Sequence, residues 1–185
     1  MKIIREALRD YQAICKIGSS TGKDSSLCVE MTLEAYAQAI EVREIPNDHP
    51  LFIITSNTLV EHIVYDIYCN YTIKKVKAFA KQRGVNLHYL KCSPGICDSF
   101  AVKYFAGDKL LINNTLNSDC TEILKIIPSQ KAYKTARETL LTDAQKALPV
   151  IDISGVRDDE SAARKNNINK SGATAALTAE HHEAL

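Results

Sequence analysis

The chain has 185 residues, of which 45% are hydrophobic and 24% are charged, and its formal net charge is +1. This ordinary globular composition excludes a disordered or collagen-like chain, and the near-zero charge gives no overall attraction to nucleic acid or anionic lipid. The longest apolar run, Leu51–Ile54, is far short of the about 20 residues of a membrane span, and no secretory signal is visible. We therefore expect a cytoplasmic protein with no membrane segment.

Hydrophobic periodicity predicts helices and strands in alternation. Apolar residues at helical spacing, bounded by turn residues, indicate helices over 3–11, 24–42, 59–83, 97–105 and 129–146. Short apolar or alternating runs indicate strands over 13–18, 51–55, 85–91 and 150–154. This order predicts an α/β fold, a three-layer αβα domain over 1–165 with a mainly parallel twisted sheet, followed by a poorly structured tail over 166–185.

The first candidate site follows the first predicted strand, where parallel sheets bind ligands. It combines small residues, hydroxyls and one cation at a predicted helix N-terminus: Ser20, Thr21, Gly22, Lys23, Asp24 and Ser25. Free N–H groups and the helix dipole at such an end favour a phosphate group. Asp24 is a candidate for capping the helix or for holding Mg²⁺, and an ordinary capped turn is the alternative interpretation of the whole run.

A second set of small polar residues follows the second predicted strand. It consists of Thr55, Ser56, Asn57 and Thr58. Such side chains can line a pocket for adenine or ribose, and the alternative is that one of them caps the next helix.

Two later segments carry cations that can reach phosphate. Lys125 lies in the segment Cys120–Pro128, where Cys120 is either a ligand of a metal cluster, a reactive thiol or a buried small hydrophobe. After the fourth predicted strand come Gly155, Arg157, Glu160 and Arg164. Arginine forks bind phosphate oxygens, and a glutamate between two arginines can orient both, although a solvated surface helix has the same pattern.

Together these segments resemble the N-type ATP pyrophosphatases (PP-loop family), in the branch similar to phosphoadenylylsulfate (PAPS) reductase. The run Ser20–Ser25 resembles the Ser-Gly-Gly-x-Asp-Ser loop of that family, with Thr21 in place of a glycine. Three further segments look most like the DndC family of sulfurtransferases in bacterial DNA phosphorothioation: Thr58–Glu61, Cys120–Pro128 and Gly155–Arg164. The resemblance spans roughly 12–165, and Asn57 stands where that family tends to have Asp.

The resemblance implies an ATP pyrophosphatase that adenylates an oxygen, which sulfur then displaces. ATP phosphates would lie on the run Ser20–Ser25, together with Mg²⁺. The ATP site would be completed by the second set of polar residues, by Lys125 and by the residues after the fourth strand. The catalytic residues it implies are Lys23, Asp24, Lys125 and Arg157. The implied partners are a cysteine desulfurase or sulfur carrier and other DNA-modification subunits, with DNA contacted through the complex.

The resemblance leaves three points open. DndC-like proteins resemble iron–sulfur enzymes, which makes Cys120 a candidate ligand, but Cys120 is the last cysteine of the sequence and no thiolate follows it. PAPS reductase itself uses a C-terminal cysteine, which the tail from Asn166 lacks. Another sulfurtransferase of the PP-loop family, or a nucleotide-binding subunit without turnover, therefore remains an alternative function.

Overall fold

A computed structural model describes residues 1–109 and 119–155 of the chain. Its centre is a four-stranded sheet in the order β3-β2-β1-β4, in which every pair of neighbouring strands is parallel. The strands are β1 (Ile14–Gly18), β2 (Pro50–Ser56), β3 (Asn86–Cys92) and β4 (Val150–Ser154). Each predicted strand is confirmed, with ends that differ by at most one residue.

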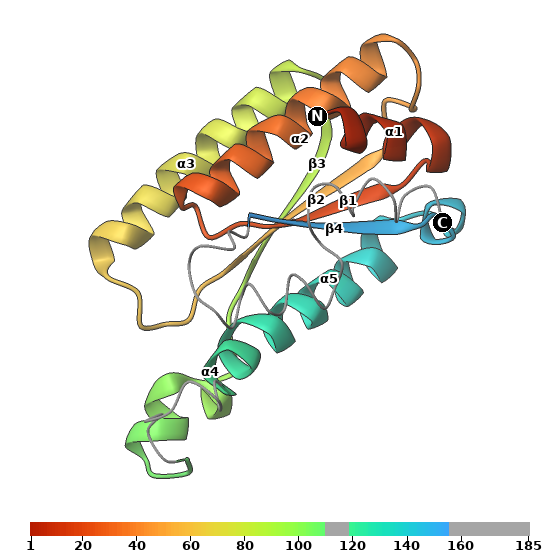
Figure 1. Cartoon of the computed structure of the whole chain (residues 1–185). Coiled ribbons are helices and arrows are strands. Elements are labelled where there is room, and N and C mark those ends of the chain that lie inside the picture. The colour runs from red at the N-terminus through yellow and green to blue at the C-terminus, as the bar shows by residue number, and fades with distance from the viewer. Residues whose placement is uncertain (110–118, 156–185) are drawn as a thin grey trace.

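Helices cover both faces of this sheet (Figure 1). On one face lie α1 (Lys2–Tyr11), α2 (Lys23–Glu41) and α3 (Ile63–Gln82), and on the other lies α5 (Ile127–Leu140). The shorter elements are η1 (Ile96–Asp98), η2 (Ala101–Phe105), α4 (Asp119–Thr121), η3 (Glu122–Ile126) and α6 (Asp143–Lys146). The three-layer αβα fold is thereby confirmed, and no helix in 1–109 or 119–155 is long and apolar enough to cross a bilayer.

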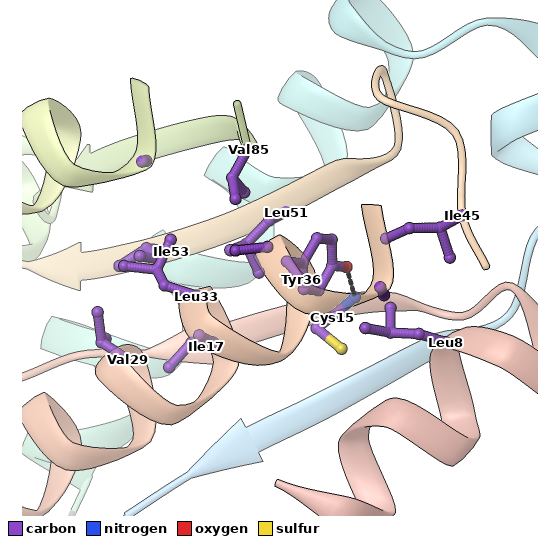
Figure 2. Close-up of a cluster of buried hydrophobic side chains, with 13 residues drawn as sticks. Leu8, Cys15, Ile17, Val29, Leu33, Tyr36, Ile45, Leu51, Ile53 and Val85 are labelled. Atoms are coloured by element: carbon purple, nitrogen blue, oxygen red, sulfur yellow. Dashed lines mark hydrogen bonds between the residues drawn. The ribbon is translucent and has the colours of Figure 1, made fainter. Parts of the chain in front are cut away.

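The larger hydrophobic core lies between the sheet and the helices α1 and α2 (Figure 2). Alternate residues of β1 and β2, including Ile17 and Leu51, point into it because successive strand side chains face opposite sides. Tyr36 of α2 is fully buried there, and its hydroxyl accepts a hydrogen bond from the Cys15 amide (3.0 Å) and donates one to the Pro50 carbonyl (3.1 Å). This side chain ties α2 to both central strands.

A smaller core lies on the other face, beneath α5. Ile14 and Phe52 are fully buried there against Ala136 and Leu141. Phe52 also meets the Tyr133 ring edge-on, with 5.1 Å between the ring centroids. The sheet is therefore buried on both sides, which explains why its strands are nearly continuous apolar runs.

Three predicted helices differ from the structure. The helix expected over 97–105 is instead the 3₁₀ turn η1 followed by the π-helical turn η2. The helix expected over 59–83 begins at Ile63, because Asn57 first forms a turn by accepting from the Leu59 amide (2.9 Å), and His62 then caps the helix. The helix expected over 129–146 is split into α5 and α6, because Thr142 forms a capping box that starts a new helix.

Burial of His49 predicts a loss of stability in mild acid. Burial lowers the pKa of His49 from the usual 6.5, and its Nε2 lies 3.1 Å from the Ala13 carbonyl, which can only accept a hydrogen bond. The unfolded chain therefore binds more protons than the folded one, and the free energy of unfolding falls as pH drops below about 6.5.

The variant His49→Gln keeps a donor for the Ala13 carbonyl but does not titrate. We expect its urea midpoint to depend less on pH than that of the unmodified chain, between about pH 5 and 6.5. Burial also lowers the pKa of His88, so part of the dependence remains in the variant. Equal slopes for the two proteins would contradict this assignment.

Candidate nucleotide site at the switch point of the sheet

The order of the strands creates a crevice between β1 and β4. The chain leaves β1 through α2 on one face, but it reaches β4, on the other side of β1, after α5 on the opposite face. The loops after β1 and β4 therefore diverge, and ligands of open parallel sheets bind at such a switch point. A cavity of about 470 Å³ opens there, between these loops, β2 and the start of α5. We call it the switch-point cavity.

The loop after β1 ends in a helix N-terminus that no side chain caps. The N-cap of α2 is Gly22, in extended conformation and without a side-chain hydrogen bond to the helix. Ser20 and Ser25 both line the cavity; their hydroxyls lie 3.2 Å apart, and that of Ser25 donates to the Gly22 carbonyl (3.1 Å). Lys23 is exposed and Asp24 half-buried in the first turn. The first turn of α2 thus offers N–H groups and hydroxyls to an anion.

Thr21 holds a backbone conformation that favours glycine. Its φ is +55°, in the left-handed region that a β-branched residue rarely adopts and that costs roughly 1–2 kcal/mol. Its hydroxyl donates to the Ser20 carbonyl (2.7 Å) and lies 3.0 Å from the Cys69 sulfur of α3. Tyr65 of α3 also donates to the Ser20 carbonyl. These bonds from α3 hold the strained loop, and they turn Thr21 away from the switch-point cavity.

Two lysines bring positive charge into the cavity. Lys125 is exposed on η3, a π-helical turn, and such turns occur frequently at functional sites. Lys16 projects from the middle of β1, with its ammonium 2.6 Å from the Asp152 carboxylate of β4 and 4.9 Å from the centre of the Tyr133 ring. Lys16 is already paired with Asp152, so Lys125 is the better candidate to bind an added anion.

Only part of the second polar set reaches the cavity. Ser56 lines it, and its hydroxyl lies 2.9 Å from that of Ser129. Thr55 points to the other face of the sheet, because neighbouring residues of a strand alternate. Asn57 holds a turn, and Thr58 donates to the Glu61 carboxylate (2.8 Å). Asn57 and Thr58 are therefore engaged in local structure.

The end of β4 packs directly on the start of α2. A Cβ atom on Gly155 would lie 2.7 Å from the backbone carbonyl carbon of Asp24, closer than real Cβ atoms come. Gly155 also lines the switch-point cavity. The other candidates after β4, namely Arg157, Glu160 and Arg164, lie outside the described residues, as does the expected tail over 166–185.

Lys16, Asp152 and Tyr65 are among the residues that line this cavity and that the sequence pattern did not predict. A signal for the first two was present, because each is a lone charge of opposite sign in the middle of an apolar strand. Their Cα atoms are direct partners in the β1–β4 register. Tyr65 had no comparable signal, since it lies within an apolar helical pattern.

Over 1–109 and 119–155, no group of three or more His, Cys, Asp or Glu side chains is arranged to hold a metal ion. Cys120 lies in α4 and belongs to no such group among the described residues. Mg²⁺ differs, because phosphate oxygens and one or two carboxylates supply its usual ligands. Asp24 is the carboxylate that the sequence suggests, but neither it nor Lys23 is among the residues that line the switch-point cavity.

Comparison with known proteins does not assign the chain to a family. No protein-family model matches it, and no curated protein does. The function must therefore be argued from the site itself.

Proposed function

We propose that the chain is an ATP pyrophosphatase that activates an oxygen atom by adenylation for sulfur transfer. The observation that carries this proposal is that Ser25, in the first turn of a helix whose N-cap is a glycine, lines the switch-point cavity together with Lys125. A triphosphate requires both N–H donors and cations, and such crevices are where nucleotides bind in parallel sheets. The composition of the loop Ser20–Ser25, which resembles that of the PP-loop family, points to the same ligand.

The proposed chemistry needs little beyond positioning and charge. The acceptor oxygen forms a bond to the α-phosphorus while the bond to the bridging oxygen breaks, and pyrophosphate leaves with the electron pair. Negative charge then grows on the leaving group, so Lys125 stabilises the transition state more than the bound substrate. Asp24 would hold Mg²⁺ on the phosphate oxygens, and Arg157 and Arg164 would add positive charge.

The finer proposal is a DndC-like role in DNA phosphorothioate modification. It rests on the resemblance of Thr58–Glu61, Cys120–Pro128 and Gly155–Arg164 to that family. In this role the protein is cytoplasmic, receives sulfur from a cysteine desulfurase or sulfur carrier, and contacts DNA through other subunits. Another sulfurtransferase of the PP-loop family would share the ATP step and differ in the acceptor.

The experiment that tests the ATP step is an analysis of its products. The chain is incubated with Mg²⁺ and ATP labelled at the α-phosphate, alone and with a candidate acceptor, and labelled nucleotides and pyrophosphate are measured. We expect AMP and pyrophosphate, and we expect EDTA to stop their formation because Mg²⁺ would supply positive charge to the phosphates. ADP and inorganic phosphate would show cleavage at the wrong bond and overturn the proposal.

One observation favours a second function, that of a nucleotide-binding subunit without turnover. Thr21 occupies a left-handed position where the resembling family has glycine, and its side chain is fixed to α3 rather than free to adapt. This alternative predicts saturable ATP binding with no pyrophosphate release under any acceptor condition. Binding measured by calorimetry alongside the product analysis separates the two functions.

A further inference from the structure

Six large apolar side chains lie exposed on the segment that leads into α3 and on the first half of that helix. Each residue is between 51% and 76% exposed: Val60, Ile63, Val64, Ile67, Tyr68 and Tyr71. We call them the α3 patch. In Figure 1 α3 lies at the outside of its helical layer, with α2 between it and α1. Scattered exposed apolar residues need no explanation, whereas a contiguous group of this kind marks a binding surface.

The first half of α3 is apolar on two sides. Its inner stripe, with Cys69 and Ile73, is buried against the rest of the protein. The outer residues Val64, Ile67 and Tyr71 recur at intervals of three and four, so they form a second stripe on the exposed side of the helix. A helix that is apolar all round is normally buried. This half of α3 therefore has the composition of a helix between two partners, of which the described residues supply one.

The α3 patch is large enough for a stable subunit interface. Because a large side chain covers about 150–250 Å² when free, six that are more than half exposed present on the order of 700 Å². The largest apolar patch of a monomer is typically about 300–600 Å², whereas a standard interface takes about 800 Å² from each partner. Interfaces between identical subunits are also more apolar than others. Size and composition together favour a protein partner that covers the whole patch.

Charges at the two ends of the α3 patch favour a second copy of this chain as that partner. Glu61 is exposed at the N-terminal end, and Lys74 and Lys75 are exposed just past the C-terminal end. If two copies of α3 pack antiparallel with a two-fold axis beside Ile67, residues at equal distances before and after Ile67 face each other. Lys74 of one copy then lies opposite position 60 of the other, next to Glu61. Parallel packing would instead bring the lysines of both copies together, which is unfavourable.

We propose that the chain forms a symmetric homodimer through the α3 patch, with the two copies of α3 antiparallel. Ile67 packs against its own counterpart at the two-fold axis, and Glu61 of each copy pairs with Lys74 of the other. An anionic lipid surface fits the patch less well, because it would repel Glu61. Glu61 and Tyr65 also line the switch-point cavity, so the dimer interface adjoins the candidate nucleotide site. The proposal itself does not depend on ATP.

Sedimentation velocity of the full chain without nucleotide tests this dimer. We expect a Kd of about 10 µM or tighter, since interfaces of standard size bind with micromolar affinity or better. The variant Ile67→Asp places two carboxylates at the two-fold axis, so it should weaken the dimer at least about thirtyfold, as loss of a central contact does. The matched control is Ile96→Asp on η1, which changes an isoleucine that is 82% exposed outside the α3 patch and should leave the Kd unchanged.

Two results would overturn the dimer. The first is a monomer at about 100 µM, far above the expected Kd. Binding of that monomer to anionic vesicles would then assign the α3 patch to a lipid surface instead. The second is an equal loss of affinity in Ile67→Asp and Ile96→Asp, because the interface would then not be centred on α3.

A charge exchange tests the antiparallel arrangement. Lys74→Glu and Glu61→Lys should each weaken the dimer roughly two- to tenfold, because each sets like charges against each other in two symmetric places. The double variant restores opposite pairs and should recover most of the affinity of the unmodified chain. Both residues are exposed, so the circular dichroism spectra should not change. A double variant that binds no better than the single variants would contradict the pairing of Glu61 with Lys74 and overturn the proposal.

Discussion

We expect replacement of Lys125 by alanine to lower the proposed rate of pyrophosphate release from ATP by about 10²–10³-fold, with much less effect on ATP affinity. The reason is that Lys125 lines the switch-point cavity from the π-helical turn η3, where the proposed ATP site would place the leaving pyrophosphate. A positioned group that meets developing charge contributes about this much to the rate. Because ground-state binding is shared with the α2 N-terminus, kcat falls more than KM rises.

The matched control is Lys134→Ala. Lys134 is an exposed lysine on α5, two to three turns further along, and it does not line the switch-point cavity. Both variants remove one positive charge from the same run of helix, so a general charge effect would slow both equally. We expect Lys134→Ala to keep the rate of the unmodified chain. Equal losses in the two variants, or an unchanged rate in Lys125→Ala, would remove Lys125 from the site.

The fold was predictable because its signals are local. Each strand is a short apolar run bounded by turn residues, and alternation with helices leaves a parallel sheet as the natural arrangement. The predicted helix boundaries were wrong where side-chain hydrogen bonds set the end of a helix against the hydrophobic pattern. The apolar residues Leu59 and Val60 continue the helical pattern of α3, yet the turn made by Asn57 keeps them outside the helix, where both are more than half exposed.

The candidate site was predictable only in part, because it depends on which face each residue takes. Position after a strand correctly brought Ser20, Ser25, Ser56 and Gly155 to one cavity, which Lys125 of η3 also lines. The same rule predicted that Thr55 would lie there. Because neighbouring residues of a strand face opposite sides, its side chain instead lies on the face of the sheet that α2 and α3 cover. Lys16 was missed because it lies before the strand end and reaches the cavity only through its long side chain.

Replacing Gly155 by alanine should destabilise the fold by about 1–3 kcal/mol, the usual cost of added volume in a tightly packed place. The new Cβ would meet the Asp24 carbonyl carbon at 2.7 Å and the Ser25 amide nitrogen at 2.9 Å. Both are backbone atoms of the first turn of α2, so no flexible side chain can yield. Relief requires β4 and α2 to move apart, and that movement would also misplace the N–H groups that the proposed phosphate site uses.

The control is Gly95→Ala, since a Cβ on Gly95 meets nothing within 4 Å and its φ is −62°. Alanine at such a position leaves stability unchanged or raises it slightly, because it restricts the unfolded chain. Urea unfolding of both variants tests the packing, and ATP affinity measured by calorimetry tests its consequence for the site. We expect Gly155→Ala to lose stability and ATP affinity together, and Gly95→Ala to lose neither. Lost stability with full ATP affinity would mean that the first turn of α2 does not hold the phosphates, whereas full stability would mean that β4 and α2 are less tightly packed than the contact distances indicate.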